Sequence, residues 1–233
     1  MSPRRVPVSR RDRPAKPPLS RDGAVAVALR IMHEEGLERV TMRRLATELD
    51  TGPASLYVYV QNMAELHGAI LDELLARLHL PPADADRWHD ELVGLLCAYT
   101  HLLLDHPSLA RSVLTLRPSG RHYLRLVDTI LGLLRAGGVP IGQAAWGVDV
   151  LLQLGTATAA EHGTRGELAG ADDERQLFVM ALREAPEQEH PNIAEARDDL
   201  FSGAGMQRLT WAFTALVAGV RSTATPVPEI AEG

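Results

Sequence analysis

Apolar residues recur along most of the chain at the three- and four-residue spacing of an amphipathic helix. The first set lies between Ser20, a good helix N-cap, and Gly36, a helix stop, and consists of Val25, Ala28, Leu29 and Met32. It predicts a helix over 20–35. A second stripe of Leu45, Ala46 and Leu49 predicts a helix that Thr41 caps and that ends near Asp50.

The same spacing continues through the rest of the chain, broken at Pro107, at the GGVP of 137–140 and at 164–171. It predicts further helices near 86–105, 107–116, 120–136, 141–162, 172–185, 192–201 and 204–221. The sequence therefore predicts an all-α fold.

The stretch TGPASLYVYVQNM, residues 51–63, is the exception, because LYVYV alternates as a strand does. A lone strand has no neighbour here to pair with, and an isolated strand is not stable in water. Pro53 is well placed to open a short helix over 53–59. Asn62 and Glu65 form a capping pattern for a further helix to about Leu78. Helix, turn and short helix predict a helix-turn-helix, whose second helix enters the major groove of DNA.

Composition predicts a soluble, cytoplasmic protein of one large or two small domains. The chain has 233 residues, 45% of them hydrophobic, and Cys97 is its one cysteine. A single cysteine favours a reducing compartment. No apolar run approaches the roughly 20 residues of a membrane helix, and no signal peptide is evident, so we expect no membrane partner.

Charge is distributed unevenly along the chain. Residues 1–21 carry seven basic side chains and one acidic one, a net +6, which leaves 17 basic and 29 acidic residues, a net −12, for the remainder. A basic, Pro-rich arm on an acidic body is typical of tails that add DNA contacts. The alternative is a solvated, disordered tail.

The N-terminal sixty residues resemble the TetR family of transcriptional regulators. The resemblance covers LSRDGAVAVALRIMHEEGLERVTMRRLATELDTGPASLYVYVQNMAELHGAILDELL. It rests on the leading apolar helix, on EGL before VTMRRLA, and on SLY followed by V-x-N and a helix. The family implies a homodimer that binds a palindromic, double-stranded operator and a small-molecule effector. We expect a basic arm at 1–19, a helix-turn-helix domain at 20–66, an effector-binding and dimerisation domain at 67–222, and a flexible tail at 223–233.

The resemblance assigns DNA-binding roles to residues of the second and third helices. They are Thr41, Arg43, Arg44, Gly52, Pro53, Ala54, Ser55, Tyr57 and Tyr59. Gly52 to Ser55 would face base edges, the others phosphates, while Leu56 and Val60 would be buried. The alternatives are that Thr41 is only an N-cap, that Tyr57 mainly packs, and that Arg44 is a solvated charge.

One position departs from the family pattern. Met63 stands where many members place a phosphate-binding lysine. Residues 22–66 hold four basic and seven acidic side chains, so this module is net negative. Because phosphate neutralisation supplies most non-specific affinity for DNA, we expect the basic arm to supply the missing charge.

In the family, two late helices of each subunit form the dimer interface. Two apolar stripes suit that role: Val148, Leu151, Leu152 and Gly155, and Leu209, Phe213, Leu216, Val217 and Val220. The alternative is that both stripes belong to the core of one subunit.

The family's effector pocket lies among the middle helices and is mostly apolar. The residues expected there are Leu96, Tyr99, Leu103, Leu114, Leu116, Tyr123, Val127, Trp146, Gln153 and Thr156, with core packing as the alternative for each. Val113 and Leu116 stand where the tetracycline-responsive branch presents a histidine and a threonine for its metal chelate, and Ala159 stands near the place of an acidic partner. We therefore expect an apolar or aromatic effector and no metal.

Enzymatic function is not expected. The nine histidines include no HxxxH or HExxH pair, and the chain lacks a phosphate-binding glycine loop and GxSxG. We predict no catalytic residues and no cofactor. The sequence thus predicts a ligand-responsive regulator, a repressor that its effector releases from DNA. The alternative is a helical protein that binds a small molecule or a partner and has lost specific DNA binding.

Overall fold

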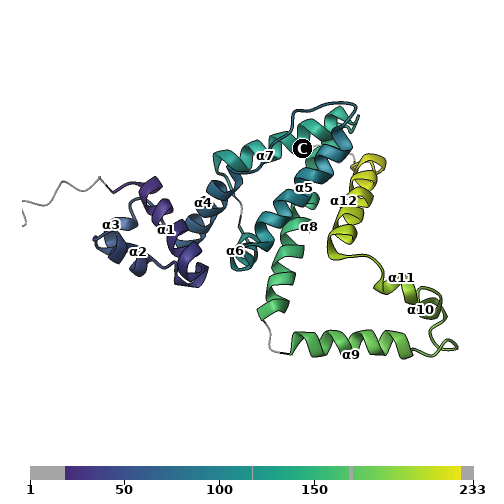
Figure 1. Ribbon diagram of the computed structural model, residues 1–233. Helices are drawn as coiled ribbons and strands as arrows, with labels where there is room; N and C mark the ends of the chain where they lie inside the picture. Colours follow the sequence, from purple (N-terminus) through teal and green to yellow (C-terminus); the bar gives the residue numbers. More distant parts are fainter. Residues whose placement is uncertain (1–18, 117, 168–169, 227–233) are drawn as a thin grey trace, which may run out of the picture. The chain divides into compact units, whose positions relative to one another are not determined.

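The structure is a computed structural model that describes residues 19–116, 118–167 and 170–226 (Figure 1). Among these residues every regular element is a helix, which confirms the predicted all-α fold. The chain divides into two compact units, the first ending at Met63 and the second beginning at Ala64. The basic arm up to residue 18 and the tail from 227 lie outside the described residues.

From residue 19 onward, the first unit contains three α-helices and one 3-10 turn. They are α1 (Arg21–Glu35), η2 (Leu37–Arg39), α2 (Met42–Glu48) and α3 (Pro53–Leu56). Both predicted caps are present: Ser20 Oγ accepts from the N–H of Gly23 at 3.0 Å, and Thr41 Oγ1 accepts from the N–H of Arg44 at 3.1 Å. These bonds satisfy N–H groups that a helix start leaves unpaired.

A small apolar core holds the first unit together. α1 contributes Ala24, Val25, Ala28, Ile31 and Met32, and the later elements add Leu37, Val40, Met42, Leu45, Ala46, Leu56 and Val60. Burying one such leucine contributes roughly 1.5–3 kcal/mol. The four-residue α3 therefore depends on this core rather than on its own helical propensity.

The second unit is built around one long helix. Its elements are α4 (Met63–Leu75), α5 (Trp88–Leu104), α6 (Pro107–Val113), α7 (Arg121–Ala136), α8 (Ile141–Glu167), α9 (Ala171–Glu184), α10 (Pro191–Glu195), α11 (Arg197–Phe201) and α12 (Gly205–Ser222). α8 packs against α5, α6, α7 and α12, and Figure 1 shows α5 and α8 side by side.

Glycines let α8 approach its neighbours closely. A Cβ atom on Gly155 would lie 2.6 Å from Thr100 Oγ1 of α5, and one on Gly163 would lie 2.0 Å from Cβ of Pro107 at the start of α6. Both distances are too short for a real contact, so only glycine allows these helices to pack as they do.

Several boundaries differ from the prediction, among them the ends of α4 at Leu75 rather than near Leu78 and of α6 at Val113 rather than near residue 116. α3 ends at Leu56 rather than at residue 59, because the N–H groups of Tyr59 and Val60 both bond to the carbonyl of Leu56 and the chain turns there. The helix expected over 192–201 is two helices, α10 and α11, and the second begins with Asp198 and Asp199 in its first turn, where acidic residues favour a helix start. α8 runs on to Glu167.

Candidate functional site

The turn between α2 and α3 has the geometry of a helix C-terminal cap. Asp50 adopts a left-handed conformation with φ 49°, and the N–H of Thr51 bonds back to the carbonyl of Ala46 at 2.9 Å. A left-handed residue after a helix closes its last turn and redirects the chain. α3 then begins at Pro53, directly after Gly52.

α3 presents its first turn to solvent. Gly52, Pro53, Ala54 and Ser55 are all exposed, as residues that read base edges must be. The opposite side is fixed in the core, since Leu56 is 1% and Val60 2% exposed. That division of the two sides is the one that the sequence predicted.

Exposed apolar and aromatic groups follow this turn. Tyr57 is 52% exposed and Tyr59 also reaches solvent, which is compatible with the contacts expected for both. Val58, 79% exposed, was not among the expected contacts. It lies in the turn that follows α3, so helical spacing could not predict its exposure.

Arg44 is held by carboxylates of its own unit. Its guanidinium pairs with Glu35 of α1 at 2.7 Å and with Glu48 one turn along α2, and Glu48 also pairs with Arg30 of α1. Hydrogen bonds from Arg30 first, and from Arg44 second, hold the pKa of Glu48 below its ordinary value. This network joins α1 to α2 and competes with phosphate for the Arg44 side chain.

Arg43, by contrast, is exposed on the same helix, and within the described ranges the structure gives its guanidinium no carboxylate partner. Thr41 caps α2 and is itself exposed, so capping and a DNA contact remain compatible. Arg43 is thus the better placed of the two arginines for a phosphate.

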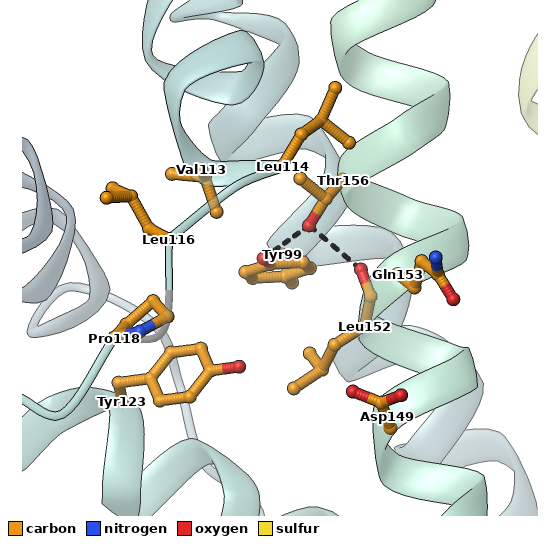
Figure 2. A pocket seen from close by; sticks show the side chains of 10 residues that line it. All are labelled: Tyr99, Val113, Leu114, Leu116, Pro118, Tyr123, Asp149, Leu152, Gln153 and Thr156. Atoms are coloured by element: carbon orange, nitrogen blue, oxygen red, sulfur yellow. Dashed lines mark hydrogen bonds between the residues drawn. The ribbon is translucent and has the colours of Figure 1, made fainter. Parts of the chain in front are cut away.

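The second unit contains a pocket between α5, α7, α8 and the C-terminal end of α6 with the segment that follows it (Figure 2). It is lined by Tyr99, Val113, Leu114, Leu116, Pro118, Tyr123, Asp149, Leu152, Gln153 and Thr156. Within it, Tyr99 Oη lies 2.7 Å from Thr156 Oγ1, and Thr156 donates to the carbonyl of Leu152 at 2.9 Å. Burial raises the pKa of Tyr99 well above its ordinary value, so the phenol keeps its proton at neutral pH.

Six of the ten residues expected in the pocket line it: Tyr99, Leu114, Leu116, Tyr123, Gln153 and Thr156. Of the other four, Leu96 and Leu103 are core residues, Val127 is half-buried on α7 outside the lining, and Trp146 faces solvent from α8. The other four lining residues, Val113, Pro118, Asp149 and Leu152, were not in the expected set, and Leu152 was expected at the dimer interface. A lone carboxylate on a helix is more often a solvated group, so no sequence signal marked Asp149.

A buried carboxylate fixes one wall of this pocket. Asp72 of α4 accepts hydrogen bonds from the N–H groups of His122 and Tyr123, both at 2.9 Å, and so caps the N-terminus of α7. A Cβ on Gly120 would lie 2.1 Å from Cγ of Asp72, so a glycine is needed at that position. The backbone of the pocket residue Tyr123 is thereby attached to α4.

Most of the residues expected at a dimer interface pack inside the subunit. Those that are buried are Val148, Leu151, Leu152, Gly155, Leu209, Phe213 and Val217, while Leu216 and Val220 are half-buried. The close approach that Gly155 permits is to α5 of the same chain. The outer faces of the same two helices instead carry Trp146, Val150 and Trp211, the last 72% exposed.

A metal site and a membrane-spanning helix are both absent from the part of the chain that the structure describes. It contains no group of three or more histidine, cysteine or acidic side chains that could hold a metal ion. No helix there is both long and apolar enough to cross a membrane.

A helix-turn-helix with an exposed leading turn, followed by a larger helical unit with a pocket, defines a DNA-binding protein with a ligand-binding domain. Residues 24–70 match the family model of the bacterial regulatory proteins of the tetR family, and residues 80–221 match the tetracyclin repressor-like C-terminal domain. The chain therefore belongs to the TetR family of ligand-responsive transcriptional regulators. Members of this family bind operators and small effectors, form dimers and are regulators rather than enzymes.

Solved structures and curated relatives agree with this assignment. SCO7704 of Streptomyces coelicolor, a candidate transcription regulator, is 51% identical, with a TM-score of 0.75 over 91% of this chain and 100% of that one. ActR of Streptomyces coelicolor, solved in complex with actinorhodin, is 31% identical, with a TM-score of 0.76 over 87% of this chain and 95% of that one. The transcriptional repressor DrrR1 of Streptomyces coeruleorubidus is 29% identical over 93% of this chain and 85% of its own.

Proposed function

We propose that this protein is a dimeric repressor that binds a palindromic operator in the cytoplasm and leaves it when an apolar or aromatic effector enters the pocket. The observation that carries the proposal is the exposed first turn of α3 above the buried Leu56 and Val60. Relatives support it further, since DrrR1 is a repressor and ActR binds actinorhodin.

A DNA-binding measurement tests the proposal. The DNA upstream of the protein's own gene is labelled, and binding is followed by fluorescence anisotropy at several salt concentrations. We expect Ser55→Asp to lower specific affinity at least tenfold, because a carboxylate at base edges and phosphates repels DNA. Gln176→Asp adds the same charge at an exposed position on α9 of the second unit and should leave affinity unchanged. Absence of specific binding at every salt concentration would favour the alternative of a ligand-binding protein without DNA affinity.

The basic arm is proposed to supply phosphate contacts. Residues 1–18 lie outside the described residues, so the support comes from charge: the helix-turn-helix segment is net negative, and Arg44 is already paired with Glu35 and Glu48. Deleting 1–18 should weaken operator binding and flatten the dependence of log K on log salt, since each lost phosphate contact lowers that slope by about 0.9. Unchanged affinity and slope would refute this role.

The dimer interface is proposed to lie on the outer faces of α8 and α12. Trp146, Val150 and Trp211 leave large apolar surfaces exposed there, and buried aromatic residues dominate the energetics of interfaces. Trp211→Glu should therefore shift the protein from dimer to monomer in analytical ultracentrifugation. Leu124→Glu, at an exposed site on α7, is the matched control and should stay dimeric. A dimeric Trp211→Glu variant would place the interface elsewhere.

A further inference from the structure

The polar groups of the pocket have a defined direction of hydrogen bonding at its inner wall. Thr156 has one hydroxyl proton, and it donates that proton to the carbonyl of Leu152. The oxygen of Thr156 must then accept from Tyr99, whose own proton is thereby used. What Tyr99 can still offer a ligand is a lone pair, so this wall accepts hydrogen bonds.

The outer part of the pocket is acidic. Among the residues that the structure describes, Asp149 is the one charged residue of the lining, and its carboxylate has no ion-pair partner there. Gln153 and Tyr123, which lie beside the same space, are neutral and can donate or accept. Figure 2 shows the Asp149 carboxylate on α8 turned toward the side of the pocket into which the Tyr123 hydroxyl points.

The volume of the pocket limits the size of the group that it can hold. Its volume is about 120 Å³, and an engineered apolar cavity of about 150 Å³ accommodates benzene. One aromatic ring would therefore occupy most of this volume, against Val113, Leu116 and Leu152. Asp149 and Gln153 are exposed, so the rest of a larger ligand passes them on its way out.

We propose that the effector is an arylalkyl amine, with its ring against Val113, Leu116 and Leu152 and its protonated nitrogen paired with Asp149. The inference rests on the proposed function, namely that this pocket receives the effector. A cation gains from the unpaired carboxylate, whereas a carboxylic acid would meet Asp149 as a like charge and Tyr99 as an acceptor. The pocket thus selects for a positive charge on its ligand.

Three probes with one aromatic ring test the charge preference: benzylamine, benzyl alcohol and phenylacetic acid. Their binding to the full-length protein is measured at pH 7 by isothermal titration calorimetry, and release of operator DNA is followed in parallel. We expect the amine to bind about three- to tenfold more tightly than the alcohol, since an ion pair near solvent contributes modestly, and the acid to bind more weakly than both.

Asp149→Asn should remove the preference for the amine over the alcohol. Asp128→Asn removes the same charge from an exposed site on α7 outside the pocket, and it should keep the preference. Binding of the acid as tight as that of the amine, or an amine preference that survives Asp149→Asn, would overturn the charge assignment. In that case the proposal that this pocket binds the effector would remain supported, provided that the alcohol binds the protein and causes it to release DNA. Failure of all three probes to bind would overturn both proposals.

Discussion

Replacing Asp72 by alanine should destabilise the second unit by about 3 kcal/mol. The side chain is buried and accepts two backbone N–H groups at the first turn of α7. Loss of a hydrogen bond to a charged group costs about 1.5–3 kcal/mol, and loss of a negative charge at a helix N-terminus costs roughly 0.3–1 kcal/mol more. Alanine would also leave both N–H groups without their acceptor, which places the estimate toward the upper end of that range.

Urea unfolding followed by circular dichroism measures this loss. If the free energy of unfolding falls by about 3 kcal/mol per molar urea, the urea concentration at the unfolding midpoint should be about 1 M lower in the variant. Asp72→Asn keeps one acceptor oxygen and should lose roughly half as much stability. Glu73→Ala removes an exposed carboxylate from the next position of α4 and is the matched control. If the midpoints of Asp72→Ala and Glu73→Ala agree, the cap does not stabilise the unit and the reasoning fails.

Three further substitutions test other parts of the structure. Arg30 and Arg44 lower the pKa of Glu48 in the folded state, so Glu48 stabilises the fold fully above its unfolded pKa of about 4.3 and loses this effect as the pH falls through the lower folded value. The melting temperature of the unchanged protein should therefore exceed that of Glu48→Gln at pH 7, and the difference should shrink at pH 3. A difference that stays constant with pH would contradict the network. Leu56→Ala should cost about 2–5 kcal/mol in chemical unfolding of the first unit, and a loss under 1 kcal/mol would show that α3 is not anchored there. Gly155→Ala should destabilise the subunit by about 1–3 kcal/mol through its contact with Thr100, whereas intact stability with a weaker dimer would place Gly155 at the interface instead.

Local patterns in the sequence predicted most helices to within a few residues. Caps and breakers act over one turn, so Ser20, Thr41 and Pro53 mark helix starts that the structure confirms. The division of α3 into an exposed turn and a buried side could also be predicted, because two apolar residues four positions apart identify the core-facing side.

Contacts between distant residues could not be predicted in the same way. An apolar stripe such as Leu209, Phe213 and Val217 shows that a helix face is buried, but the same stripe suits the core of a subunit and an interface between subunits. The partners of Arg44 depend on how α1 and α2 cross, and Asp72 caps a helix that begins about fifty residues later. Only the folded arrangement determines such partners.

The bond between Asp72 and α7 has a consequence for how this regulator can diversify. Asp72 holds main-chain N–H groups, one of them that of Tyr123, and makes neither bond through the side chain that lines the pocket. Exchanging the tyrosine for another residue would change what the pocket admits but leave both hydrogen bonds intact. Ligand preference and the attachment of the pocket wall to α4 are therefore separate traits, and mutation can alter the first while preserving the second.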